Sequence, residues 1–341
     1  MHKHGGDIYG NKNVIDFSAN INPLGMPEAV KKAALNAVCK STAYPDAEYR
    51  ELLKAVSAME GVEKGNIICG CGAAELVFAA VYAIRPKNAL LVVPGFEEYR
   101  QALNAVGCSI ENYYLKEENG FMPDEEILEF INGRTDMVFI CNPNNPTGTV
   151  FTKELLLKII DRCREHDVLA VVDECFNNFM ENGEDYTVKG ESGVLVLKAF
   201  TKMYGMAGLR LGYGITDDRS LLLSMRNCIQ PWSVSTVAHD AGLAACACTG
   251  FADAARKIIS EEKKYLLGNI VSLAEKIYGS GGNFIFFKAE PGLYGKLMEK
   301  GIMIRDCKNF TGLKEGYYRI AVKNREDNEK LISAWKEVAK G

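Results

Sequence analysis

The 341-residue chain has no apolar run approaching the roughly 18 residues that a membrane-spanning helix needs, so no transmembrane segment is expected. Its opening residues, MHKHGGDIYG, lack the apolar core of a secretory signal, and we therefore expect a cytoplasmic protein. The chain also lacks a strong excess of either charge. With a formal net charge of -4 it has no general attraction to nucleic acid, so any site for an anion must be built locally.

Two kinds of ligand site are also missing from the sequence pattern. The eleven cysteines are scattered without a C-x2-C pair, and the C-x-C pairs at 69–71 and 246–248 have no His or second pair nearby. We therefore expect free thiols in a reducing compartment and no metal site. Residues 69–74 read CGCGAA, which has too few glycines for a G-x-G-x-x-G turn, and this argues against a nucleotide-binding oxidoreductase.

The pattern that is present alternates short apolar runs with segments of helical period, from about residue 67 to about residue 198. This alternation predicts an α/β domain with a mostly parallel central sheet flanked by helices. Beyond about residue 235 the pattern changes to long helical segments followed by short strands, which predicts a smaller α+β domain. These segments are 237–248 and 251–278 for the helices and 284–288, 302–305 and 317–322 for the strands.

The chain length is ordinary for one large and one small domain. We expect residues 1–38 to form an N-terminal segment that belongs with the small domain. Residues 39–235 should form the large domain, and residues 236–341 should supply a helical connection followed by the small domain.

The most informative stretch, AFTKMYGMAGLRLGY at residues 199–213, follows an apolar strand and so lies at a sheet edge, where sites in α/β proteins gather. It holds Lys202 and Arg210. A lysine amine attacks an aldehyde only when it is neutral, and burial or a nearby cation lowers its pKa. An arginine offers a bidentate partner for a phosphate. The alternative is a surface lysine beside an arginine held in a salt bridge.

Four further segments place small or polar residues after expected strands. Residues 70–75 read GCGAAE, a turn that lets the backbone approach a ligand and opens a helix whose N–H groups suit an anion, although many helices start after glycine. Residues 94–99 read PGFEEY, residues 142–148 read NPNNPTG, and Asp173 follows an apolar run. A carboxylate at the end of a buried strand needs a partner. The alternatives are that Phe96 is ordinary core and that Asp173 caps the next segment.

In order and spacing, these segments resemble the fold-type I superfamily of PLP-dependent aminotransferases, and the resemblance covers most of the chain. It implies the cofactor pyridoxal 5′-phosphate, held covalently by Lys202, with Asp173 paired to the protonated pyridine nitrogen as the second catalytic residue. It also implies that Phe96 stacks on the pyridine ring and that Asn145 donates to the cofactor oxygen O3′. The remaining cofactor-binding positions that it implies are Gly72, Ala73, Ala74, Phe176, Thr201 and Arg210.

Segments near both ends of the chain narrow the resemblance. Residues 4–7 read HGGD and residues 16–25 read DFSANINPLG, while residues 301–307 read GIMIRDC and residues 319–322 read RIAV. Together they resemble the branch that contains threonine-phosphate decarboxylase and histidinol-phosphate aminotransferase. Both of these enzymes act on amino compounds that carry a phosphate, so the resemblance implies a small phosphorylated substrate.

The same branch implies a set of substrate-binding residues. Arg319 is expected to grip the substrate carboxylate, and Asn145 is expected to lie beside the substrate. Arg305, His4 and Asn22 are expected to meet the substrate phosphate or to shape its pocket.

The branch also implies a homodimer with shared active sites, in which Tyr44 reaches the cofactor phosphate of the neighbouring subunit. From the residues alone, other roles stay open. The alternative for His4 is a place in a disordered tail, since chain termini often fray. Arg305 has Asp306 and Glu315 as alternative salt-bridge partners, and Tyr44 has the alternative role of a simple turn aromatic.

Two departures from the family pattern bear on function. Phe176 stands where the aminotransferases usually place a tyrosine whose hydroxyl contacts O3′, and its loss favours a decarboxylase. Ala199 stands where a serine usually binds the cofactor phosphate, so Thr201 or a water would have to replace that hydroxyl. The expected reaction is release of CO2 from threonine phosphate, which gives aminopropanol phosphate for cobalamin synthesis.

Two other functions remain as alternatives. One is histidinol-phosphate aminotransferase or a related class I or II aminotransferase. The other is a non-catalytic PLP-binding module of the kind fused to DNA-binding domains. Such a module predicts a basic helix-turn-helix segment, which the sequence does not show.

Overall fold

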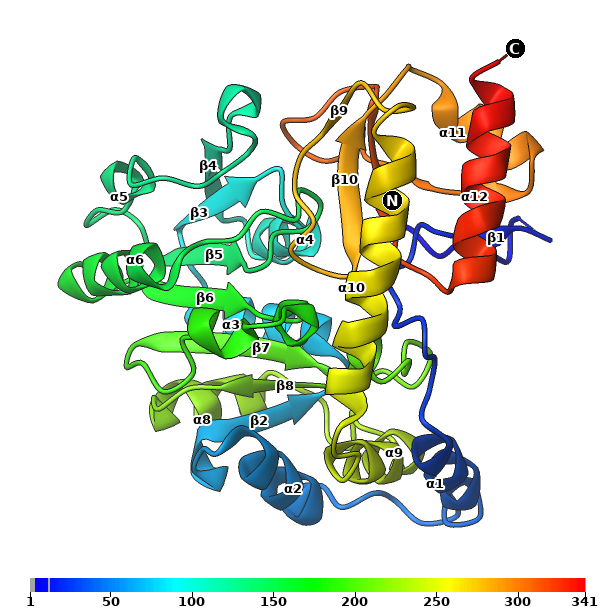
Figure 1. Ribbon diagram of the computed structural model, residues 1–341. Helices are drawn as coiled ribbons and strands as arrows, with labels where there is room; N and C mark the ends of the chain where they lie inside the picture. The colour runs from blue at the N-terminus through cyan, green and yellow to red at the C-terminus, as the bar shows by residue number, and fades with distance from the viewer. Residues whose placement is uncertain (1–3, 12, 341) are drawn as a thin grey trace.

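A central sheet of seven strands forms the larger part of the molecule (Figure 1). The computed structural model describes residues 4–11 and 13–340, and within these residues the strand order is β2-β8-β7-β6-β5-β3-β4. β8 runs antiparallel to both of its neighbours, and every other pair in this sheet is parallel. The predicted α/β fold with a mostly parallel sheet is therefore confirmed. The strands are β2 (Ile67–Gly70), β3 (Asn88–Val93), β4 (Ser109–Tyr114), β5 (Met137–Cys141), β6 (Leu169–Asp173), β7 (Val194–Ala199) and β8 (Gly212–Ile215).

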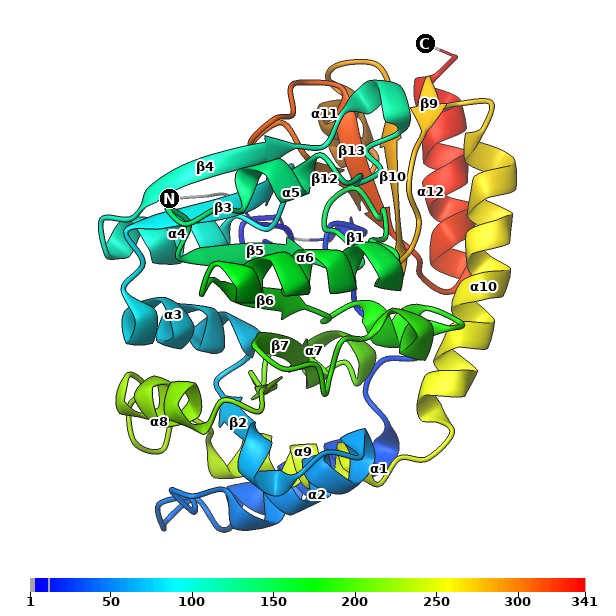
Figure 2. The ribbon, with the colours of Figure 1, turned by 90° about the vertical axis from the view of Figure 1, so that its left-hand side faces the viewer.

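Helices cover both faces of this sheet because its inner strands are apolar on both faces. Along β5, Val138 and Ile140 belong to the core that α6 covers, whereas Met137 and Phe139 belong to the core that α3, α4 and α8 cover. Figure 2 shows α6 in front of β5 and β6. A parallel strand buried on both faces requires a continuous apolar run rather than strict alternation, as β5 shows. The helices are α3 (Ala73–Ile84), α4 (Glu98–Ala105), α6 (Lys153–Glu165) and α8 (Arg219–Asn227).

A smaller unit is built on an antiparallel sheet in the order β12-β13-β10-β9, at the upper right of Figure 1. Its helices pack on the sheet through large buried side chains. The rings of Phe287 and Trp335 lie 4.9 Å apart, and both side chains are buried. This is the predicted small α+β unit. Its elements are β9 (Lys276–Ile277), β10 (Phe284–Lys288), β12 (Arg305–Asp306), β13 (Tyr317–Ala321), α10 (Phe251–Ile270), α11 (Leu293–Glu299) and α12 (Arg325–Val338).

The N-terminal segment contacts both ends of the molecule. β1 (Ile15–Asp16) pairs in parallel with β11 (Ile302–Met303), next to the smaller unit. In contrast, α1 (Glu28–Val38) packs against α9 (Thr236–Cys246) at the bottom of Figure 1. The domain boundaries expected from the sequence stay a prediction.

Several local predictions are wrong because partners far away in the sequence decide the structure there. α10 ends at Ile270, and residues 276–277, which lie inside the predicted helix, instead pair with β10 as the edge strand β9. The predicted strand at 302–305 is divided into β11 and β12, which pair with β1 and β13. In contrast, Thr152 caps α6 as predicted, since its Oγ1 accepts a hydrogen bond from the N–H of Leu155 at 3.2 Å.

Apart from helices of a single turn, two helices and one strand of the large part were not predicted. They are α2 (Arg50–Glu60), α8 and β8. β8 carries glycines at 212 and 214 in place of a β-branched run, so its sequence gives little strand signal. The glycine at 212 is required by close packing, because a Cβ there would lie 2.3 Å from the backbone nitrogen of Ala73.

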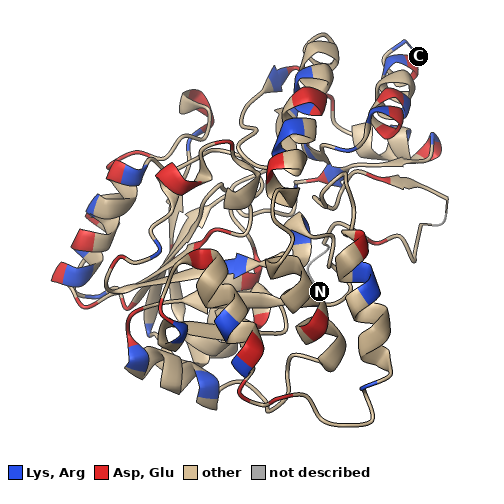
Figure 3. Cartoon of the chain, turned by 60° about the horizontal axis from the view of Figure 1, so that its bottom comes forward, with Lys and Arg blue, Asp and Glu red and all other residues tan. Residues whose placement is uncertain are grey.

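The outer helices carry charges of both signs (Figure 3), and the cysteines form no disulfides. Lys and Arg are interspersed with Asp and Glu along the outer helices (Figure 3). No helix within residues 4–11 and 13–340 is both long and apolar enough to cross a bilayer. All eleven cysteines are free thiols. Within the same described ranges, no group of three or more His, Cys, Asp or Glu side chains is placed to hold a metal ion.

Candidate active site

A cavity of about 400 Å³ opens where β5, β6 and β7 end, against the strands of the smaller unit. The carboxyl ends of parallel strands meet at one edge of a sheet, so segments that follow different strands converge there. The cavity brings together most of the residues singled out from the sequence. Those that line it are His4, Ala73, Ala74, Phe96, Asn145, Asp173, Phe176, Thr201, Lys202, Arg210, Arg305 and Arg319.

Lys202 lies in the short helix α7 (Phe200–Met203), directly after β7, with its side chain at the cavity wall. Burial, together with the charges of Arg319 and Arg210, lowers the pKa of its amine to about 8. A substantial fraction of the amine is therefore neutral near neutral pH. This placement contradicts the alternative of an ordinary surface lysine.

An anion cradle forms at the start of α3. Gly72 has a φ of +80°, a conformation that residues with a Cβ rarely adopt, and a Cβ there would lie 2.7 Å from Arg210 Nη2. Ala73 and Ala74 follow at the helix N-terminus, where backbone N–H groups favour negative charge. Gly72 does not line the cavity itself but allows the Arg210 guanidinium to approach the turn. Together with the buried hydroxyl-bearing Thr201, this arrangement suits a phosphate.

Asp173 lies buried at the base of the cavity, fixed by two donors. The Tyr99 hydroxyl donates to its Oδ2 at 2.6 Å, and the backbone N–H of Cys175 donates to its Oδ1 at 2.9 Å. The Tyr99 ring stacks on Phe139 at 4.8 Å and meets the edge of Phe96 at 5.4 Å. Asp173 does not cap the next helical segment, residues Asn177–Phe179, whose N-cap is Phe176. Its bond to Cys175 closes a local turn, and Asp173 also lines the cavity.

Two arginines from neighbouring strands enter the cavity from the smaller unit. Arg305 on β12 and Arg319 on β13 occupy directly opposite positions of the antiparallel pair. Arg319 donates to Asn145 Oδ1 and to the carbonyl oxygen of Ser18, the latter at 2.7 Å. Burial lowers the pKa of Arg319 to about 10, so this side chain stays charged at neutral pH.

Arg305 is held by its own loop. Its guanidinium donates to the carbonyl oxygen of Asp306 at 2.7 Å and to Asn309 Oδ1 at 2.8 Å. It also lies 4.9 Å from the centre of the Phe310 ring, which lines the cavity with it. These contacts fix the direction of the guanidinium, and the cavity-facing position gives an anion access to it.

The structure does not bring Asn22 and Tyr44 to the cavity. The Asn22 side chain is buried and donates to the carbonyl oxygen of Met203 at 2.7 Å, while its backbone N–H donates to the carbonyl oxygen of Lys202. It therefore holds the turn that carries Lys202. Tyr44 is 80% exposed and stacks on Trp232, with ring centroids 4.4 Å apart.

Several cavity residues were missed by sequence reasoning. Glu98 lines the cavity, with its Oε1 3.2 Å from Nδ1 of His4, and Tyr99 holds Asp173. Ser18 and Asn20 form part of the wall beside Arg319. The only available signal for Glu98 and Tyr99 was their place directly after Phe96 in PGFEEY.

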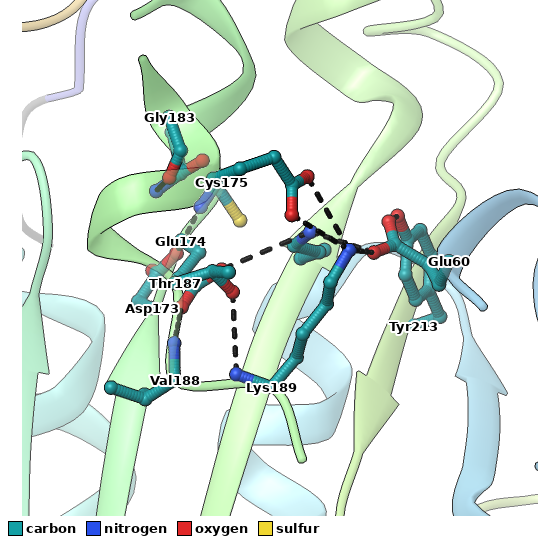
Figure 4. A network of polar contacts seen from close by, with 12 residues as sticks. Glu60, Asp173, Glu174, Cys175, Gly183, Thr187, Val188, Lys189 and Tyr213 are labelled. Carbon is teal, nitrogen blue, oxygen red and sulfur yellow. Dashed lines mark hydrogen bonds and ion pairs between the residues drawn. The ribbon is translucent and has the colours of Figure 1, made fainter. Parts of the chain in front are cut away.

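A buried ionic network supports the sheet next to Asp173 (Figure 4). Glu60 on α2 pairs with Lys198 at 2.8 Å and Lys189 at 3.1 Å, and it accepts a hydrogen bond from the Tyr213 hydroxyl at 2.5 Å. Lys198 also lies 3.8 Å from the buried Glu174, the residue after Asp173. The network thus ties α2 to the strands that end at the cavity.

We expect Glu60→Leu to destabilise the protein by about 3–5 kcal/mol, because Lys198 would remain buried without its main partner. Burial raises the pKa of Glu60, but the charge of Lys198 and its hydrogen bond outweigh this, so the pKa is lowered overall. The stabilisation is therefore complete at neutral pH and is lost only as the pH falls through that lowered pKa. Urea denaturation at neutral pH measures the change.

Glu63→Leu is the matched control for this prediction. Glu63 pairs with Arg219 at 2.8 Å on the surface, with both side chains mostly exposed, and its loss should change stability little. An equal effect of the two substitutions would show that the buried network does not contribute as described.

The fold and the cavity together define a fold-type I PLP-dependent enzyme: a strand-end lysine, a fixed acid and a phosphate cradle meet on a mostly parallel sheet. The family profile "Aminotransferase class I and II" matches residues 12–334, and the chain belongs to this family of PLP-dependent enzymes. The chain is 35% identical to the threonine-phosphate decarboxylase of Salmonella typhimurium over 352 aligned positions, covering 99% of this chain and 97% of that protein.

Two histidinol-phosphate aminotransferases are also similar to this chain over nearly its whole length. The histidinol-phosphate aminotransferase 2 of Archaeoglobus fulgidus is 30% identical over 332 positions, which cover 97% of this chain and 94% of that protein. The crystal structure of the histidinol-phosphate aminotransferase from Clostridium acetobutylicum superposes with a TM-score of 0.89 at 28% identity, covering 95% of this chain and 98% of that one.

Proposed function

We propose that this chain binds PLP and removes CO2 from threonine phosphate, giving aminopropanol phosphate. The observation that carries the proposal is the pair of arginines, Arg305 and Arg319, which come from adjacent strands and line one cavity together with Lys202. One arginine suits a carboxylate and the other a phosphate, which are the two anionic groups of this substrate. The identity of 35% over nearly the whole chain to a threonine-phosphate decarboxylase supports the same reaction.

The cavity contains residues that fit PLP. The cradle at Gly72, Ala73 and Arg210 would hold its phosphate, and the Asp173 carboxylate would hold a proton on its pyridine nitrogen. Phe96, at the cavity wall, would cover the ring. When bound, PLP supplies an electron sink for the negative charge that develops at the substrate Cα.

The side chains of the protein decide which bond at Cα is cleaved. With PLP bound, the orientation of the substrate would decide which bond at Cα overlaps with the π system and is cleaved, so the residues that orient the substrate would select the reaction. Arg319 and Lys202 line the same cavity. Arg319 would orient the substrate carboxylate, and Lys202 Nζ would deliver a proton to Cα after CO2 has left. Asp173 would act indirectly, because its carboxylate is fixed before the reaction and would keep the pyridine nitrogen protonated. The positive charge on that nitrogen would then stabilise the negative charge that develops at Cα.

A second candidate is transamination of histidinol phosphate. It is favoured by the 30% identity to a histidinol-phosphate aminotransferase and by the TM-score of 0.89 to another. Histidinol phosphate carries no carboxylate, however, so Arg319 would have no anion to bind while that substrate reacts. The ring at position 176 presents no hydroxyl and packs against Phe284 at 5.1 Å, as expected for the decarboxylase.

The deciding experiment incubates the holoenzyme with O-phospho-L-threonine in the absence of any keto acid. We expect release of CO2 and formation of aminopropanol phosphate, with L-threonine as a much poorer substrate. Activity only with histidinol phosphate and 2-oxoglutarate would support the aminotransferase and contradict the decarboxylase.

Uptake of PLP by the apoprotein should depend on the neutral fraction of Lys202. With a pKa of about 8, about a tenth of the amine is neutral at pH 7, against about four in ten thousand for an ordinary lysine. The rate should therefore rise with pH and level off above about 8, measured by the absorbance of the bound cofactor. Arg319→Gln should move the midpoint upward, because it removes a neighbouring positive charge. A wild-type midpoint near that of free lysine would contradict the described environment.

We also propose a homodimer in the cytoplasm in which Tyr44 reaches the active site of the second subunit. Its exposure, together with that of Trp232, leaves this aromatic pair available to a second copy of the chain. Light scattering on the purified holoenzyme tests the oligomeric state.

A further inference from the structure

Glu98 is a carboxylate in a cavity otherwise suited to anions. It is the first residue of α4, and its side chain is only 17% exposed. Oε1 lies 3.2 Å from His4 Nδ1, whereas Oε2 is buried and has no hydrogen-bond partner among the described residues. Buried acceptors in folded proteins almost always have a hydrogen-bond partner, so we expect a bound ligand to form the missing hydrogen bond to Oε2.

The groups around Glu98 indicate what that ligand carries. His4 from the N-terminal segment contacts it, and Lys202 and Arg305 lie close enough to act on its charge. Asp173 and the adjacent Glu97 oppose them with negative charge. Positively charged groups that suit the phosphate of a substrate therefore surround the carboxyl group of Glu98. If that carboxyl group were ionised, it would repel the phosphate.

Protonation removes this conflict. Burial raises the pKa of Glu98 to about 7, and the charges of Asp173 and Glu97 add to the rise while that of Lys202 opposes it. The second ionisation of a phosphate ester has a pKa of about 6. Near neutral pH, the carboxyl group and a phosphate ester can therefore hold one proton between them.

We propose that Glu98 Oε2 and an oxygen of the substrate phosphate share a single proton, which makes Glu98 a substrate-binding residue that sets the pH range of phosphate recognition. Either the protonated carboxyl donates to a phosphate dianion, or a phosphate monoanion donates to the carboxylate. Both descriptions contain the same atoms and the same net charge. The inference rests on the proposed function insofar as the substrate carries a phosphate.

The test measures binding of ethyl phosphate, which carries no reactive amine, to the holoenzyme by calorimetry at about pH 6.5 and about pH 8.5. Between the lower and the higher pH, the dissociation constant of the wild type should rise about ten times as much as that of Glu98→Gln. The reason is that binding to the wild type requires one further proton. The glutamine amide is neutral at both pH values and can donate to the phosphate without a titratable proton. The ionisation of the phosphate itself contributes equally to both proteins.

Two further variants separate Glu98 from its neighbours. His4→Gln retains Glu98 and should retain the pH dependence of the wild type, although the affinity itself should fall. Glu129→Gln changes an exposed glutamate outside the cavity and should leave both dissociation constants unchanged. Loss of the pH dependence in His4→Gln would assign it to the histidine and overturn the inference.

The remaining outcomes are distinguishable from one another. Equal pH dependence in the wild type and Glu98→Gln overturns the inference and leaves the proposed function intact. If O-phospho-L-threonine binds the holoenzyme no more tightly than L-threonine, the phosphate site is absent, and the inference and the proposed function fail together.

Discussion

Lys202→Ala should lower turnover by about 10⁴-fold or more, because it removes both the covalent anchor and the proton donor at Cα. The structure places this amine at the strand end, within the cavity and with a pKa lowered to about 8. Borohydride treatment of the wild-type holoenzyme, followed by mass spectrometry of its peptides, should locate the reduced cofactor on Lys202. The variant should yield no such peptide and should lose the absorbance of the bound cofactor.

Lys158→Ala provides the matched control for this result. Lys158 is a half-exposed lysine that pairs with Glu125 and Glu154 on the surface, and its loss should leave turnover and the labelled peptide unchanged. A reduced cofactor found on another lysine in the wild type, or full activity of Lys202→Ala, would overturn the assignment of the site.

Asp173→Asn should lower kcat by about 10²–10³-fold, because the amide retains the shape of the side chain but not its negative charge. In the proposed mechanism the charge keeps a proton on the pyridine nitrogen, and the carboxylate is held in place by Tyr99 and the N–H of Cys175. Cofactor content after gel filtration should be measured together with kcat, so that loss of cofactor is separated from loss of chemistry.

Tyr99→Phe is the informative comparison for Asp173. It removes one of the two hydrogen bonds to the carboxylate but leaves the charge, so kcat should fall by about tenfold, as expected for one hydrogen bond to a charged group. If Asp173→Asn retained kcat within about twofold of the wild type, the carboxylate would not act on the cofactor as proposed.

The large sheet and most of the site could be predicted because the local sequence carries the necessary signals. β5, β6 and β7 are continuous apolar runs, and each is followed by a polar or small motif that a parallel sheet must bring to one edge. The order of these motifs resembles that of fold-type I enzymes, and this resemblance predicted that Lys202, Asp173 and Asn145 share one site. All three line one cavity in the structure.

Other features had no local signal. β8 is rich in glycine and becomes a strand only because it fills the space between β2 and β7. The helix predicted over 251–278 ends early because the edge of β10 offers backbone hydrogen bonds to residues 276–277. Glu98 resembles any other glutamate at a helix start, and nothing in the sequence shows that its Oε2 is buried without a partner.

By itself, the sequence determined the α/β fold, the order of the motifs and the residues proposed to react, since each depends on residue type and short-range spacing. The tertiary structure alone decided how the charged groups are paired and arranged in the cavity. It placed Arg305 opposite Arg319 across two strands, held Asp173 with Tyr99 from a distant helix, and set Glu98 beside His4. These effects depend on distance and burial, which act through space between residues far apart in the chain.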